Sequence, residues 1–225
     1  MQSEKKSLVV VQNASLSIGN LSILKGLSFT IEQQELVAIV GESGSGKSMT
    51  ALMLMGLQPK KATLEAELLT FESRDLKTLT PSDWQKRRGK TLGMVFQEPQ
   101  SSLNPTQRCG KQLLEVLKIH RNISSKEGAV QVTKALEEVQ LHDSKRILKS
   151  YPHQLSGGQK QRIMIAMALL CKPKLLIADE PTTALDGVVA RKLQKTMDKI
   201  AENKGEMGEN TGKKTVICIT HHLDD

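Results

Sequence analysis

The loop at residues 41–48, Gly-Glu-Ser-Gly-Ser-Gly-Lys-Ser, constrains the fold more than any other part of the chain. The short, β-branched, apolar run Leu36–Val40 precedes it and predicts a buried strand. A largely apolar helical pattern follows at residues 50–57, where Gly56 and Pro59 are stop signals. Strand, glycine loop and helix in this order predict a phosphate-binding loop rather than a chance match in a glycine-rich turn.

The residue types of this loop suit a polyphosphate. Its members are Gly41, Glu42, Ser43, Gly44, Ser45, Gly46, Lys47 and Ser48. Glycines allow successive backbone N–H groups to point into one concavity, and the positive end of the following helix adds its field. We expect Lys47 to reach the β- and γ-phosphates of a nucleotide and the Ser48 hydroxyl to ligate Mg²⁺.

A second apolar run, at residues 175–180, ends in two acids, Asp179 and Glu180. Carboxylates seldom close a buried strand for structural reasons, because a carboxylate is costly to bury without a partner. Asp179 is therefore expected to hold the Mg²⁺ hydration shell, and Glu180, on the other side of the strand, to act as general base towards an attacking water. The alternative role of helix N-cap fits Asp186 better.

Together these stretches make the chain similar to the nucleotide-binding domain of ATP-binding cassette transporters. The matching motifs follow the family's order: the Walker A loop at 41–48, the Q-loop Gln97, the signature Leu-Ser-Gly-Gly-Gln at 155–159, the Walker B strand at 175–180, the D-loop at 184–186 and the switch His221. The resemblance implies a P-loop NTPase core of the α/β class, with a mainly parallel sheet and flanking helices. It also implies an N-terminal antiparallel β layer and an inserted helical subdomain.

The same resemblance assigns further site residues. Gln97 and His221 join Glu180 as catalytic residues, and Ser48, Gln97 and Asp179 form the Mg²⁺ site. Gln97 could instead be a surface glutamine, but its place between the strand at 92–96 and Pro99 favours a hinge to the helical subdomain. For His221, helix capping is the alternative, which fits the neighbouring His222 better.

The signature residues open a helix that continues to Leu170, and a helix N-terminus with small residues is a second anion site. A single chain has no use for two anion sites on one nucleotide, unless a partner chain supplies the second site. The family's solution is a head-to-tail dimer with ATP between two subunits, either a homodimer or a heterodimer with a second ATPase subunit. The residues expected to contact the partner's ATP in trans are Ser156, Gly157, Gly158, Gln159 and Asp186.

The stretches at 95–105, 151–159 and 177–186 are similar to the peptide and nickel importers of this family. This similarity implies an ATPase subunit that energises import of peptides or nickel or other metal chelates. Its partners would be membrane permease subunits and, indirectly, an extracytoplasmic substrate-binding protein, and it would sit peripherally at the cytoplasmic face of the bacterial inner membrane. The alternative is a soluble ABC-type ATPase not coupled to transport.

Organisation along the chain fits one ABC-type domain over residues 1–225. Residues 8–31 alternate and residues 60–74 continue that small β layer, whereas a helical subdomain is inserted at about 98–155. A helix at about 188–201 and a polar, glycine-rich insertion at 203–214 precede the strand Thr215–Thr220. Relatives continue past the switch histidine, so we expect the chain to be truncated at its C-terminus.

Composition narrows the function classes. The longest apolar run, residues 163–171, is far shorter than the roughly 18 residues that span a bilayer. The net charge of +8 raises nucleic-acid binding as a rival, but the lysines are scattered and aromatic residues make up 2%, so a base-stacking platform is lacking. The three cysteines, Cys109, Cys171 and Cys218, suggest neither a disulfide framework nor a metal site.

Two departures from the family pattern stand out. Gln34 occupies a turn position where relatives usually have glycine. No aromatic residue precedes Phe29, so the adenine-stacking residue is missing and Ile18 aligns with its position.

Overall fold

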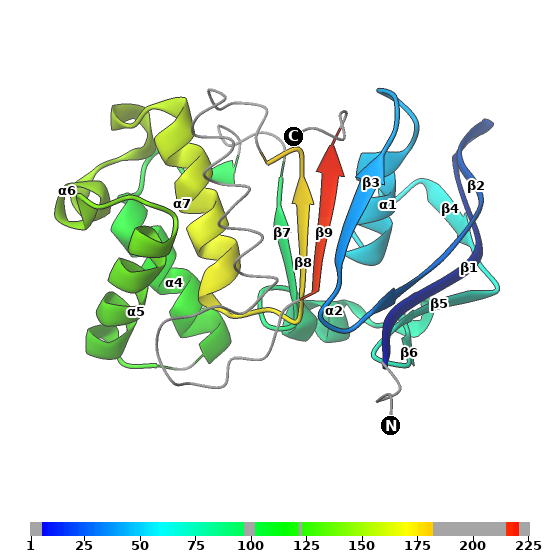
Figure 1. Cartoon of the computed structure of the whole chain (residues 1–225), viewed down its shortest axis with the longest axis horizontal. Helices are drawn as coiled ribbons and strands as arrows, with labels where there is room; N and C mark the ends of the chain where they lie inside the picture. Colours follow the sequence, from blue (N-terminus) through cyan, green and yellow to red (C-terminus); the bar gives the residue numbers. More distant parts are fainter. Residues whose placement is uncertain (1–5, 97–101, 122, 182–214, 221–225) are drawn as a thin grey trace.

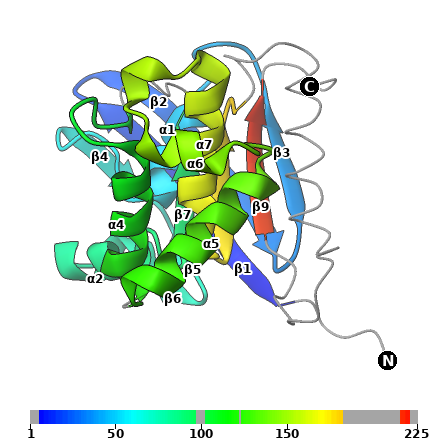
Figure 2. The same cartoon turned by 90° about the vertical axis from the view of Figure 1, so that its left-hand side faces the viewer.

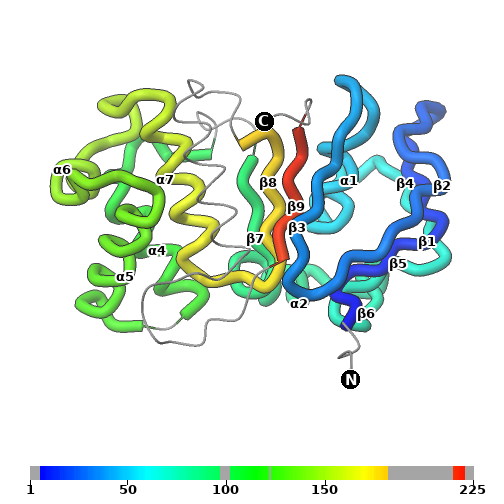
Figure 3. Tube along the Cα trace, in the orientation of Figure 1, coloured from blue at the N-terminus to red at the C-terminus, as the bar shows by residue number. Residues whose placement is uncertain are grey.

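The computed structural model describes residues 6–96, 102–121, 123–181 and 215–220. Figure 1 shows the order of the layers: a group of helices at one end, a parallel sheet in the middle, and helix α1 (Lys47–Leu54) between that sheet and an antiparallel sheet. The tube in Figure 3 shows how the chain returns to the central sheet: β9 (Thr215–Thr220) lies beside β3 (Leu36–Val40), and β8 (Leu175–Asp179) lies on the other side of β9.

The antiparallel sheet is built around one long strand, β1 (Ser7–Ile18). It pairs with β2, β4 and β5, and β6 pairs with β5. These strands are β2 (Leu21–Glu32), β4 (Ala62–Glu65), β5 (Leu68–Phe71) and β6 (Arg74–Asp75). The predicted small β layer at 8–31 and 60–74 is therefore present.

The parallel sheet has the strand order β3-β9-β8-β7, where β7 is Leu92–Val95. One row of its register joins Val37, Ile217, Ile177 and Met94. Every residue of β8 is buried, as expected for a parallel strand covered on both faces.

The prediction that Leu36–Val40 is a buried strand was wrong in part. β3 is a strand, but among the described strands it pairs only with β9, so it lies at an edge. Leu36 and Val40 are 45% and 40% exposed, and Ala38 between them is exposed too, so the side chains on one face of this strand are exposed. The apolar run identified the strand but not its place in the sheet.

The two faces of the parallel sheet contact different cores. Leu175, Ile177 and Ile217 pack with α1 and the antiparallel sheet. Leu176, Ala178 and Val216 pack with the helices at the other end. Successive side chains of β8 therefore point alternately into the two cores.

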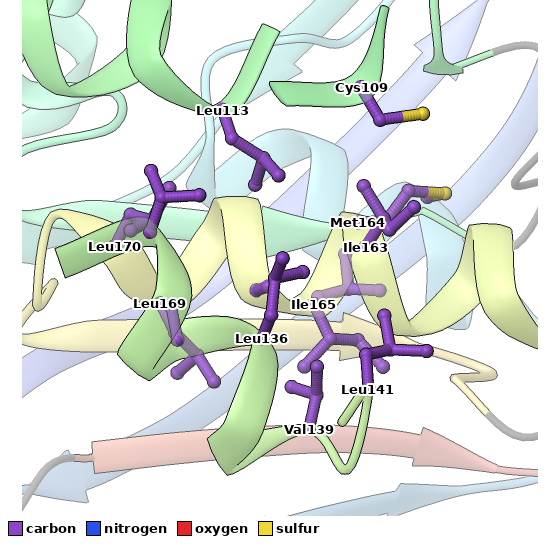
Figure 4. Close-up of a cluster of buried hydrophobic side chains, with 14 of the residues drawn as sticks. Cys109, Leu113, Leu136, Val139, Leu141, Ile163, Met164, Ile165, Leu169 and Leu170 are labelled. Carbon is purple, nitrogen blue, oxygen red and sulfur yellow. The ribbon is translucent and has the colours of Figure 1, made fainter. Parts of the chain in front are cut away.

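Four helices cover the face of the parallel sheet that lies opposite α1 (Figure 2). They are α4 (Cys109–Arg121), α5 (Ser125–Glu138), α6 (Ser144–Lys149) and α7 (Gly157–Leu170). In Figure 4, Ile163, Ile165 and Leu169 of α7 lie among buried side chains that include Leu113 and Leu136. The shorter elements are α2 (Pro81–Arg87) and the 3₁₀ turns Leu76–Thr78 and Pro152–Gln154.

The predicted α/β fold class is confirmed, including the antiparallel layer and the helical group. The helix expected directly after the phosphate loop, with its apolar stretch at residues 50–57, begins at Lys47 inside the loop motif and ends at Leu54, before Gly56. The expected helix at 188–201 and insertion at 203–214 lie outside the described residues. In the part of the chain that is described, no helix is both long and apolar enough to cross a membrane.

Candidate functional site

The phosphate loop joins β3 to α1, as the sequence predicts. Gly46 is the N-cap of α1, with a left-handed φ of 92°. A Cβ at Gly46 would lie 2.6 Å from Leu24 Cδ2, so β2 packs directly against the loop. Both the backbone conformation and this close approach require glycine.

Lys47 lies inside the loop and is only 7% exposed. Its Nζ donates hydrogen bonds to the carbonyl oxygens of Gly41, at 2.7 Å, and Glu42, at 2.8 Å. The ammonium is therefore oriented by the loop backbone at the N-terminal end of α1. Backbone N–H groups at a helix N-terminus together with a fixed cation form a suitable site for phosphate oxygens.

Two of the three residues expected at the Mg²⁺ site, Ser48 and Asp179, lie together, although they come from distant parts of the sequence. Ser48 Oγ donates to Asp179 Oδ1 at 3.2 Å, which brings the start of α1 to the end of β8. Two ligand oxygens of an octahedral Mg²⁺ lie about 3 Å apart, so this pair suits the ion. No cluster of three or more His, Cys, Asp or Glu occurs within the described ranges. A Mg²⁺ ion bound with a nucleotide does not require such a cluster, because it usually takes only one or two protein oxygens beside those of the phosphates.

Glu180 follows Asp179 at the carboxyl end of β8 and is 7% exposed. Its φ of 48° is left-handed, a conformation that costs a non-glycine residue about 1–3 kcal/mol. Its N–H donates to the Ile219 carbonyl of β9 at 3.0 Å. The glutamate is thus held in an unfavourable backbone conformation at the carboxyl ends of the parallel strands, where the phosphate loop also lies (Figure 1).

The predicted signature residues form the start of α7. Ser156 is the N-cap in a reciprocal capping box: its Oγ accepts from the Gln159 N–H, and Gln159 Oε1 accepts from the Ser156 N–H. Ser156 and Gly157 are exposed, and a Cβ built at Gly157 would have no neighbour within 4 Å. The helix therefore presents an open N-terminus.

The phosphate loop and the signature turn lie on different sides of the parallel sheet. α1 packs with the core on one face, whereas α7 packs with the core on the other. The structure therefore brings Lys47, Ser48, Asp179 and Glu180 to the carboxyl end of the parallel strands, with α1 and α7 on opposite faces of the sheet. Gln97, Asp186 and His221 lie outside the described residues.

Sequence reasoning missed one buried polar residue near this site, Gln161 of α7. It is 0% exposed, and its Nε2 donates to the Pro181 carbonyl directly after Glu180. Its spacing of three and four residues from Met164 and Ile165, both apolar, was the available signal that it lies on the buried face.

Comparisons with known proteins agree with this arrangement. The family model described as ABC transporter matches residues 24–183. The chain is 44% identical to the oligopeptide transport ATP-binding protein OppD of Escherichia coli (strain K12) over 205 residues, which is 91% of this chain and 58% of the relative. It is 41% identical to the glutathione import ATP-binding protein GsiA of Shigella dysenteriae serotype 1 (strain Sd197), covering 96% of this chain and 35% of the relative. The chain thus spans little more than half, or less, of these relatives.

A solved structure of an ATP-binding cassette has a similar fold. The dimeric, post-hydrolysis structure of the ATP-binding cassette MJ0796 bound to ADP and Pi is similar, with a TM-score of 0.81 and 29% sequence identity. The similarity covers 96% of this chain and 89% of that one.

Proposed function

The chain belongs to the ABC transporter family, and we propose that it binds and hydrolyses ATP as the energy-coupling subunit of a bacterial peptide importer. The observation that carries the proposal is the assembly of Lys47, Ser48, Asp179 and Glu180 at the carboxyl end of the parallel strands. The relatives are named as oligopeptide transport and glutathione import proteins, which favours a peptide over a nickel chelate as cargo. Such a subunit would act at the cytoplasmic face of the inner membrane beside its permease.

Each residue of the site has a role in this proposal. The loop N–H groups and Lys47 hold the β- and γ-phosphates, and Ser48 with Asp179 holds Mg²⁺, which neutralises charge on those phosphates. Glu180 orients the attacking water and accepts its proton. Gln97 and His221 are proposed to complete the site from the family pattern alone.

Gly157 supports the proposal that ATP is shared between two chains. Gly157 has neither a left-handed φ nor, outside its own helix backbone and chain neighbours, an atom that an added Cβ would meet. The described residues of its own chain give no reason for a glycine there. The close approach of a group from outside the chain would give one, and the phosphate held by a partner subunit is such a group.

Coupling to a permease can be tested by cross-linking in cells. Thr106, in the exposed turn before α4, is expected as Thr106→Cys to form a cross-link with a membrane permease subunit. Its backbone N–H still donates to Asn104 Oδ1, so the turn is kept. The native cysteines will compete little, because all are buried and burial raises the pKa of the Cys109 and Cys171 thiols.

Thr30→Cys is the matched control, since Thr30 is exposed on β2 in the antiparallel sheet at the far end from the helices (Figure 1). The importer proposal expects a permease product from Thr106→Cys only. Ribosomal or DNA-bound products at Thr106 would instead favour a soluble ABC-type ATPase.

Base selectivity gives a separate prediction. Ile18, at the end of β1, pairs with Leu21 of β2 and is only partly buried. Base stacking on an aromatic ring contributes about 1–3 kcal/mol, so Ile18→Tyr should tighten ATP binding roughly 5- to 150-fold. In the native chain the phosphate contacts dominate, and GTP should compete with ATP within about one order of magnitude.

Nucleotide titration of Ile18→Tyr and of Leu21→Tyr checks this. Leu21 is 64% exposed on the neighbouring strand, so an aromatic residue there controls for added surface apolarity and should give no gain. Strong ATP preference in the native chain, without tightening by Ile18→Tyr, would mean that another group binds the base.

A further inference from the structure

Gln161 connects the signature helix to the end of the strand that carries Glu180. It lies one turn inside α7 and is 0% exposed. Its side-chain Nε2 donates to the Pro181 carbonyl at 2.7 Å, and this bond is itself buried. The side chain therefore joins two segments that the sequence separates by twenty residues.

The Pro181 carbonyl is a buried acceptor that needs a donor. Pro181 has no N–H, so its carbonyl is the polar backbone group that it offers, and only a donor can satisfy it. Gln161 supplies that donor with Nε2, while its Oε1 has no hydrogen-bond partner among the described residues. A buried glutamine that satisfies one neighbour and leaves its own oxygen unpaired is costly for stability, which suggests a use beyond packing.

The peptide at Glu180 is held from two sides. The Glu180 N–H donates to Ile219 of β9, and the next carbonyl, of Pro181, accepts from Gln161 of α7. Glu180 has a left-handed φ, and such a conformation persists only where its surroundings fix it. Removal of one of the two bonds should therefore let this backbone relax and change the direction of the Glu180 carboxylate.

α7 is well suited to carry an anchor of this kind. Ile163, Met164 and Ile165 follow Gln161 and are all buried in the helical core (Figure 4). The helix is therefore a rigid body that links its exposed N-terminus at Ser156 to Pro181.

We infer that Gln161 is a positioning residue, which holds the Pro181 carbonyl and thereby fixes the Glu180 carboxylate relative to the start of α7. The inference rests on the proposed function, in which Glu180 acts on water and the start of α7 contacts a partner's ATP. Under it, displacement of α7 is transmitted to Glu180 of the same chain through one hydrogen bond.

The test uses Gln161→Met, which keeps the length of the side chain and removes the donor. Hydrogen exchange of the Glu180 N–H should become about tenfold faster, as expected when one supporting hydrogen bond is lost. The kcat for ATP hydrolysis per folded molecule should fall roughly tenfold, whereas ATP affinity, set by residues 41–48, should change less than about twofold.

Leu136→Ala is the matched control for a purely structural effect. It removes a fully buried side chain from the core that α7 shares, and it does not touch Pro181. It should lower the melting temperature without faster Glu180 exchange or lower kcat. Added to Glu180→Gln, Gln161→Met should cause no further loss of turnover, because both changes act through the same carboxylate.

The outcomes are separable. Unchanged Glu180 exchange in Gln161→Met, or an equal loss of kcat in Leu136→Ala, overturns the positioning role. If the native chain shows no hydrolysis that depends on Glu180, the proposed function fails, and the exchange measurement still decides whether Gln161 anchors the strand end.

Discussion

Glu180→Gln is expected to lower ATP turnover by about 10²–10⁴-fold, the usual contribution of a general base. The replacement has nearly the same shape, and the backbone bond from Glu180 N–H to Ile219 is unaffected. Lys47 and the loop carbonyls that orient it are also unchanged, so ATP binding should be retained. Single-turnover hydrolysis and nucleotide titration on the same preparation measure the two properties separately.

Glu138→Gln is a suitable control, because it removes the same charge from an exposed position at the end of α5. It should leave turnover within about twofold, as expected for a surface change far from the site. Full activity of Glu180→Gln would show that this glutamate is not the general base. Loss of ATP binding would mean that Glu180 contributes to the binding of ATP itself.

The central strands were predictable from sequence because the sheet buries them on both faces. β8 and β9 correspond to continuous apolar runs, and their observed bounds agree closely with those expected. α7 was equally clear, since a capping serine and small residues precede a long apolar stretch. The Ser48–Asp179 contact joins two residues that the sequence motifs assign to one expected ion site.

Long-range packing was not predictable from these patterns. An apolar run does not tell whether a strand is central or at an edge, and β3 lies at an edge among the described strands. The contact of Leu24 with Gly46 and the bond from Gln161 to Pro181 join segments that no local periodicity relates. Both depend on how the layers stack, which is a property of the whole fold.

Gly157→Asp should have opposite effects on the fold and on the function. The isolated chain has room for the side chain, since no atom beyond the neighbouring residues and the backbone of α7 lies within 4 Å of the added Cβ. α7 has no acid in its first turn, and an acid there gains about 0.3–1 kcal/mol from the helix dipole. The melting temperature should therefore stay the same or rise slightly.

In the proposed dimer the same carboxylate would face the γ-phosphate held by the partner chain. Juxtaposed like charges at an interface cost several kcal/mol, so ATP-driven dimerisation and turnover should fall roughly 10²–10³-fold. Gly157→Ala separates charge from size: it should also keep the fold stable, and it should weaken the dimer only as far as a methyl group hinders close approach. Sedimentation with ATP in the Glu180→Gln background, where hydrolysis is blocked, measures the dimer directly. A Gly157→Asp chain that dimerises and hydrolyses ATP normally would place the start of α7 away from any nucleotide, and the glycine would then need another explanation.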